Sequence, residues 1–167
     1  MEIKKISRLA MLLAISVILN IIESFFPIFN GVVPGLKLGL ANIVTLLILY
    51  VYGFKDAVIT SILRIFLVGI LRTGLFSMSF FFSLGGAIVS ILVMTLVKKT
   101  TKLSIIGVSI IGSISHTIGQ ILIATIFYNV NMIYYIGWTF ILALPTGILI
   151  GFLTKEIKKN LDIIIKW

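Results

Sequence analysis

Five ionisable side chains interrupt the apolar runs of this chain: Glu23, Lys37, Arg64, Arg72 and His116. A charge inside a bilayer is costly, so such residues are retained mainly where they face a partner, a cavity or a ligand. All five map to the middle or the outer half of one predicted helical bundle. Because three bases stand against one acid, the pattern predicts a binding site for a small anionic solute that carries a carboxylate or a phosphate.

Arg64 lies near the centre of its apolar run, where its guanidinium stays protonated and needs an anion or several carbonyl groups. Glu23 is the one acid in the same half of the bundle. A structural Arg64–Glu23 ion pair is therefore the alternative to a ligand site. Even with that pair, Lys37 and Arg72 remain to attract an anion, unless both simply extend to the membrane interface. Asn42 follows Lys37 on one predicted helix and adds an amide to this region.

A stripe of small and polar residues runs along residues 103–128. Two members, His116 and Gln120, are four residues apart on one helical face and need hydrogen-bond partners in a dry interior. His116 is either satisfied within the bundle or acts as a proton relay, and a histidine-rich metal site is excluded because no second histidine exists. The small residues allow close helix packing. They are Ser109, Gly112, Ser113, Gly119 and Ala124.

The composition is that of an integral membrane protein. Of the 167 residues, 60% are hydrophobic and 11% are charged, and the mean hydropathy is +1.25, outside the range of soluble domains. The net charge of +9 does not indicate a nucleic-acid partner, because the bases cluster at the ends of apolar runs. The chain has no cysteine, which excludes disulfides and thiolate metal sites. No metal or cofactor is expected.

Six apolar runs predict an all-helical bundle of six membrane spans in one domain, residues 1–167. The runs approach the roughly 20 residues that a spanning helix needs. They cover residues 9–27, 38–53, 57–71, 75–97, 103–128 and 132–154. Residues 155–167 form a basic amphipathic tail that we expect to lie along the membrane surface.

The loop charges predict a protein of the cell membrane with both termini in the cytoplasm. Eleven of the fourteen Lys and Arg residues fall in the amino terminus, the turn at Lys55, the loop at 98–102 and the tail. By the positive-inside rule these segments are cytoplasmic. The first apolar run lacks a small-residue cleavage site, so it is expected to be a retained span and not a signal peptide.

The segment GLKLGLANI at residues 35–43 resembles a motif of the Gx transporter family, also known as heptaprenyl diphosphate synthase component I. The resemblance extends from about Arg8 to Lys155. That family is similar in size and topology to the substrate-binding S components of energy-coupling factor transporters. The likeness implies six helices and a ligand near the outer face, under the first loop. It also implies a coupling protein that docks on Ala10 and Ala14, and two cytoplasmic ATPases that drive uptake.

The chain lacks the sequence motifs of two catalytic activities. Prenyl diphosphate synthases hold magnesium and diphosphate with paired aspartates, whereas this chain has only Asp56 and Asp162, far apart. No phosphate-binding loop of the Walker type occurs, so any ATP must be hydrolysed by a partner. We therefore expect that the chain is not an enzyme by itself.

Three functions remain open from the sequence. The first is an S component that binds a micronutrient such as a flavin, a quinone precursor or an isoprenoid phosphate. No residue in the sequence favours one of these ligands over the others. The second is an accessory membrane subunit of prenyl diphosphate or quinone synthesis, with a soluble prenyl synthase as its partner. The third is a proton-coupled carrier, for which His116 and Glu23 are the candidate titratable pair.

Overall fold

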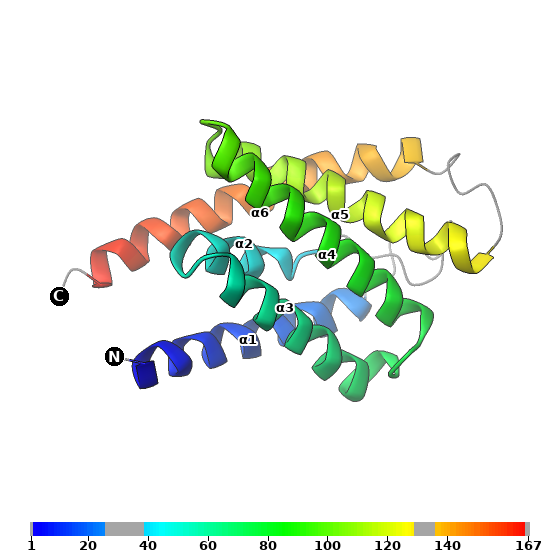
Figure 1. The fold of residues 1–167 in the computed structure, drawn as a ribbon, viewed down its shortest axis with the longest axis horizontal. Coiled ribbons are helices and arrows are strands. Elements are labelled where there is room, and N and C mark those ends of the chain that lie inside the picture. Colours follow the sequence, from blue (N-terminus) through cyan, green and yellow to red (C-terminus); the bar gives the residue numbers. More distant parts are fainter. Residues whose placement is uncertain (1, 26–38, 129–135, 166–167) are drawn as a thin grey trace.

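The computed structural model describes residues 2–25, 39–128 and 136–165. These segments are helices joined by short turns, with no strand among them (Figure 1). In chain order they are α1 (Glu2–Phe25), α2 (Asn42–Val51), α3 (Phe54–Val68), a π-helical turn η1 (Gly69–Thr73), α4 (Met78–Thr100), α5 (Ile105–Tyr128) and α6 (Ile136–Ile165). The prediction of an all-helical bundle is confirmed.

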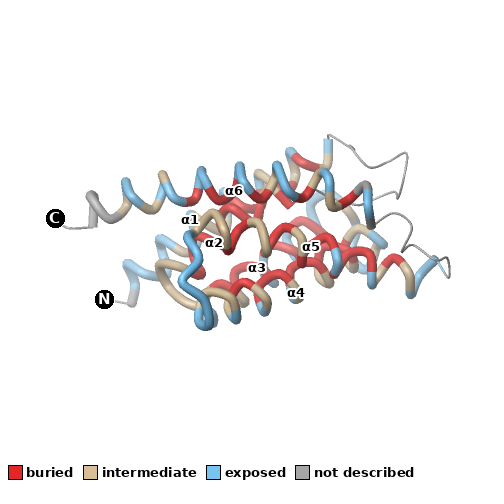
Figure 2. The backbone as a smooth tube through the Cα atoms, turned by 90° about the horizontal axis from the view of Figure 1, so that it is seen from above, coloured by how far each residue is buried: buried red, intermediate tan, exposed pale blue. Residues whose placement is uncertain are grey.

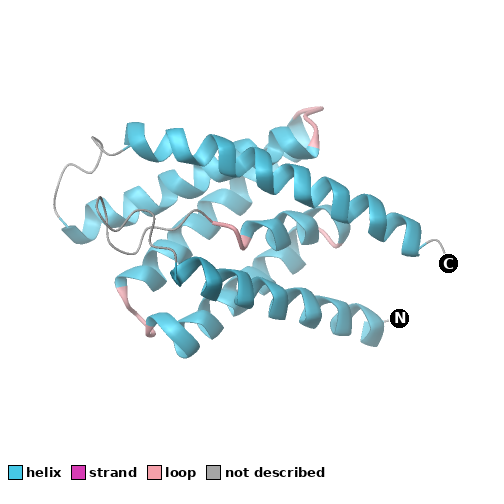
Figure 3. Ribbon diagram, turned by 180° about the vertical axis from the view of Figure 1, so that it is seen from behind, coloured by secondary structure: helices cyan, strands magenta, loops and turns pink. Residues whose placement is uncertain are grey.

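The start of α1 and the end of α6 lie at the same end of the bundle. Figures 1 and 3 show the α2–α3 turn and the α4–α5 turn on this side as well. We call it the terminal end. The end of α1, the turn η1 and the end of α5 lie at the opposite end, which we call the distal end.

Several helix bounds differ from the predicted spans. α1 begins at Glu2 and not near residue 9, and α6 continues without a break to Ile165. Residues 155–165 therefore extend α6 instead of starting a separate element. Both extensions are rich in Lys and Ile and contain no Gly or Pro, so the helix has no local reason to stop at the apolar boundary. That the tail lies on a membrane surface stays a prediction.

Four of the described helices are long and apolar enough to cross a membrane, namely α1, α4, α5 and α6. α2 has ten residues, which makes it about 15 Å long, half of the roughly 30 Å hydrocarbon core. Its residues from Asn42 to Leu49 are all buried, so it lies inside the bundle and does not span it alone. The chain is thus a multi-pass helical membrane protein. The count of six spans and the cytoplasmic location of the termini stay predictions.

Packing is centred on α2 and α5. Apolar side chains of α2 form a core with α3, α4, α5 and α6, made of Ile43, Val44, Leu46, Ile48, Leu49, Ala57, Ile91, Met94, Val108 and Ile150. Glycines bring neighbouring helices close: a Cβ at Gly119 would lie 2.5 Å from the Gly85 carbonyl oxygen, and one at Gly151 would lie 2.7 Å from Ile106 Cα. The whole predicted stripe on α5 is buried, as close packing of its small residues requires. In Figure 2 the buried residues line the interior of the bundle.

Candidate functional site

Glu23, near the end of α1, anchors the entry into α2. Its carboxylate accepts hydrogen bonds from the backbone N–H groups of Gly39 at 2.5 Å and Leu40 at 3.2 Å. Gly39 has φ +89°, a conformation that side-chain-bearing residues rarely adopt. Its carbonyl oxygen accepts from the N–H of Asn42 at 2.8 Å. The carboxylate thus fixes the turn that starts α2, where negative charge also meets the positive end of the helix dipole.

The His116 ring of α5 lies between two glycines, Gly39 before α2 and Gly86 of α4. A Cβ at Gly39 would lie 3.3 Å from the ring Cδ2, and one at Gly86 would lie 2.7 Å from Cε1. The ring Nε2 is 3.1 Å from Nε2 of Gln120, one turn further along α5. Asn42 Nδ2 lies 2.9 Å from the same Cβ position at Gly39. His116, Gln120 and Asn42 therefore converge at the entry to α2.

Arg64 of α3 reaches α2 one turn beyond Asn42. Its side chain is 2% exposed, and Nη1 donates to Thr45 Oγ1 at 3.3 Å. The Thr45 hydroxyl is itself 3.0 Å from Ser61 Oγ. No ion pair joins Arg64 to Glu23 in the described segments, although the carboxylate acts on the guanidinium through space. The direct pair that the sequence offered as an alternative is therefore not formed.

We refer to Glu23, Asn42, Arg64, His116 and Gln120 as the α2-entry cluster. All five side chains are at most 5% exposed. Three of their buried atoms have no hydrogen-bond partner among the described residues: Asn42 Nδ2, Arg64 Nε and Gln120 Oε1. Each such atom costs about 1–3 kcal/mol, and native interiors hold few of them. These unpartnered atoms are two donors, on Arg64 and Asn42, and one acceptor, on Gln120.

Four predicted site residues do not join the cluster. Arg72 is exposed on η1, where Nε donates to Ser24 Oγ at 3.3 Å and the guanidinium lies 4.3 Å from the Phe25 ring centroid. It thus sits at the end of α1, beside the residue that follows Glu23. Lys37 lies outside the described residues. Ala10 and Ala14 are exposed on α1.

The sequence analysis missed four residues that shape this site. Thr45 accepts from Arg64 and is itself bound to Ser61. Gly39 and Gly86 make room for His116. The two hydroxyl residues carried a usable signal, since each is three positions from a predicted site residue on the same helix. No sequence feature pointed to Gly86 except that it follows Gly85.

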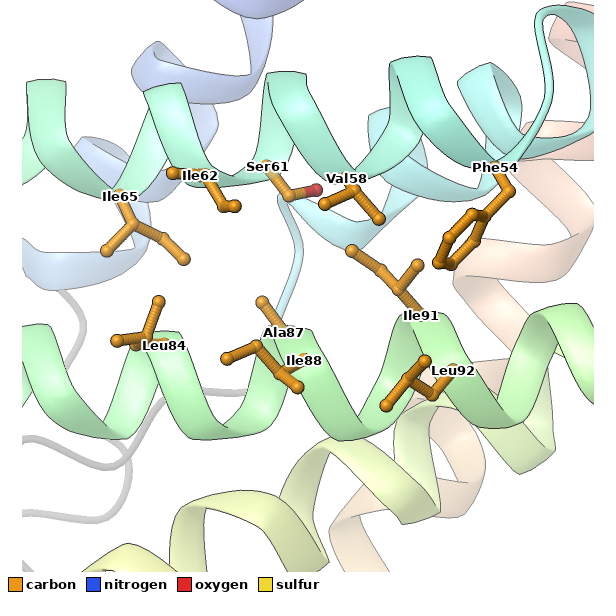
Figure 4. A pocket seen from close by; sticks show the side chains of 10 residues that line it. All are labelled: Phe54, Val58, Ser61, Ile62, Ile65, Leu84, Ala87, Ile88, Ile91 and Leu92. Carbon is orange, nitrogen blue, oxygen red and sulfur yellow. The ribbon is translucent and has the colours of Figure 1, made fainter.

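An apolar cavity of about 140 Å³ lies between α3 and α4. Figure 4 shows side chains of the two helices facing one another across it. Nine of its ten lining residues are apolar, and the exception is Ser61, whose hydroxyl is bound to Thr45. The cavity therefore meets the Arg64 network at one hydroxyl group and suits an apolar group, not an anion.

Metal binding has no support in the described segments, where no group of three His, Cys, Asp or Glu side chains lies close enough to hold an ion. Asp56, one of the two aspartates, is paired with Lys5 at 2.7 Å.

Comparison with protein families gives one match. The model of the family described as heptaprenyl diphosphate synthase component I matches residues 12–157, which include the whole α2-entry cluster. Searches of curated proteins and of solved structures gave no significant match. The family match covers most of the chain and agrees with the motif at residues 35–43. The chain belongs to the heptaprenyl diphosphate synthase component I family.

Proposed function

We propose that this chain is the substrate-binding membrane component of an energy-coupling-factor-type uptake transporter for a small anionic solute. One observation carries the proposal: the polar side chains of α1, α2, α3 and α5 meet at the entry to α2. Three of their buried atoms are unpartnered in the described segments. A ligand that bonds to these atoms removes the cost of leaving them unpaired.

Charge favours an anion at this site. The Arg64 guanidinium is buried and has no carboxylate in an ion pair within the described part of the chain. Both oxygens of Glu23 are taken up by the backbone of Gly39 and Leu40. In this proposal Arg64 and Asn42 donate to the oxyanion, whereas Glu23 is a positioning residue. Gln120 and His116 contact the polar remainder of the solute. Arg72, on η1 at the distal end, attracts it, and Lys37 adds a further positive charge.

The first span offers a face for the coupling protein. Ala10 and Ala14 are exposed one turn apart on α1, and small side chains let a partner helix approach closely in lipid. The chain has no ATP-binding loop of its own, so partner ATPases supply the energy for uptake.

Ligand retention by variants of the α2-entry cluster tests the proposal. The chain is purified in mild detergent and any bound small molecule is measured by native mass spectrometry. Arg64→Ala should weaken retention about thirtyfold or more, as for other buried charge partners. Gln120→Leu is the second variant, since it removes the unpartnered Oε1 and keeps a side chain of similar size. It also removes the Nε2 contact with His116, so the Tm of this variant is measured alongside its ligand retention. Lys159→Ala, an exposed site on α6, is the control.

Unchanged retention in both cluster variants would refute this site, provided that the wild-type chain carries a ligand. If Arg64→Ala aggregates, Gln120→Leu decides between a ligand site and a purely structural network. A folded Gln120→Leu variant with full retention would then reject the ligand site.

Coexpression with its genomic neighbours tests the transporter assignment separately. Ala14→Trp should release the coupling protein and the ATPases from the purified complex while ligand retention persists. Ile22→Trp, at an exposed position nearer the distal end of the same helix, should leave the complex intact. Equal complex yields for both variants would exclude the alanine face as the docking site.

The family name favours one alternative, an accessory membrane subunit of prenyl diphosphate synthesis. In that case a soluble, aspartate-rich prenyl synthase supplies the paired aspartates that this chain lacks. The same coexpression distinguishes the two functions, because it would recover the synthase in place of the ATPases.

A further inference from the structure

A second cavity, of about 190 Å³, lies toward the terminal end of the bundle, between α1, α2 and α6. Arg8 is the one charged residue that lines it, and Tyr52 adds a phenol. The apolar walls include Leu12, Ile15, Leu47, Val51 and Leu161. A single cation beside hydrocarbon walls is the composition of a site for an amphiphile with an anionic head and an apolar chain.

The charge of Arg8 is available to such a ligand. Lys5, one turn earlier on α1, is paired with Asp56 at 2.7 Å, whereas Arg8 has no ion-pair partner in the segments that the structure describes. Exposed lysines on other helices, among them Lys55 and Lys99, add positive charge to the terminal end. Basic residues at the edge of a membrane attract anionic lipid headgroups.

The cavity is oriented as a lipid would require. From Arg8 to Ile15 the lining advances about 10 Å along α1, from the cation into the apolar part of the helix. Ile15 is 48% exposed, so this wall opens to the bilayer beside α1. An inorganic anion would use Arg8 but would gain nothing from the apolar walls, whereas an acyl chain gains free energy by covering them.

We propose that this cavity binds one anionic phospholipid from the leaflet at the terminal end. Its phosphate lies on Arg8, and part of one acyl chain lies along Leu12, Ile15 and Leu47. The site is at the opposite end of α2 from the α2-entry cluster. It therefore stands independently of the proposed transport function.

Native mass spectrometry of the full chain, released from vesicles of equal parts phosphatidylglycerol and phosphatidylcholine, tests the assignment. The wild-type chain should retain one phosphatidylglycerol per molecule. Arg8→Gln should retain it about fivefold more weakly, because each basic group near the surface contributes roughly that factor. Lys4→Gln, an exposed base of α1 that does not line the cavity, is the matched control and should retain the lipid fully.

Ile15→Trp is the second variant, because it fills the apolar wall at an exposed position and leaves Arg8 in place. It should also lower retention of phosphatidylglycerol. Four results would overturn the proposal: equal retention of the two lipids, equal loss in Lys4→Gln and Arg8→Gln, displacement of the lipid by millimolar inorganic phosphate, or full retention by Ile15→Trp. A lipid-free dimer that Ile15→Trp dissociates would assign the cavity to a second copy of the chain instead.

Discussion

Replacing Glu23 by glutamine removes one negative charge and leaves the shape of the α2 entry almost unchanged. The native carboxylate accepts from the N–H groups of Gly39 and Leu40 at 2.5 and 3.2 Å. Glutamine offers one carbonyl oxygen in place of two acceptor oxygens. Its amide group therefore faces one of the two N–H donors, and a buried donor is left unpaired.

The expected cost follows from these contacts. Hydrogen bonds to a charged group are worth about 1.5–3 kcal/mol, and a buried unpaired donor costs about 1–3 kcal/mol. The neutral side chain recovers part of this, because the desolvation penalty of the carboxylate disappears. The Arg64 guanidinium loses the through-space attraction of Glu23 at the same time. We expect a net loss of about 2–3 kcal/mol, which corresponds to a fall in Tm on the order of 5–10 °C for a chain of this length.

Thermal unfolding of the purified chain in detergent, followed by the helical circular dichroism signal, measures this loss. Glu156→Gln is the matched control, because Glu156 of α6 makes no hydrogen bond or ion pair within the described segments. A Tm for Glu23→Gln within 2 °C of the wild type, on this ~5–10 °C scale, would refute the anchoring role. An equal fall in the control would assign the effect to net charge alone.

Two further substitutions test the packing around the site. Gly86→Ala would place a Cβ 2.7 Å from Cε1 of His116, so the ring must shift. Overpacking of this kind costs about 1–3 kcal/mol. Both the Tm and ligand retention should therefore fall. Lys98→Gln removes the ammonium that donates to the Leu49 carbonyl oxygen at 2.8 Å. The contact is partly exposed and contributes about 1 kcal/mol, so its loss should lower the Tm by a few degrees. Lys99→Gln, at the exposed neighbouring position, is the control and should leave the Tm unchanged. Unchanged thermal unfolding in either variant would contradict the contact concerned.

The general class of the protein could be predicted because its signals are local. Long apolar runs gave a helical membrane protein, and the regular spacing of His116 and Gln120 placed them together on one buried face of α5. The helix bounds differ from the predicted spans where local signals were weak. The run at 38–53 is hydrophobic on all sides, which is also the pattern of a short helix enclosed by others, as α2 is. The basic tail is as helical as the span before it, so hydropathy alone marked a boundary that the backbone does not have.

The sequence by itself determined which residues are costly to bury, but tertiary packing decided which of them meet. Glu23 is the one acid in the outer half of the predicted bundle, and Arg64 is the most central base. From charge alone, an ion pair between them was the alternative to a ligand site. In the folded chain Glu23 binds the backbone at Gly39, and Arg64 binds Thr45, 19 positions away. These partners depend on how α1, α2 and α3 lie against one another. Hydropathy and helical periodicity report only the neighbourhood within a helix, so a contact between helices is fixed by the assembled bundle.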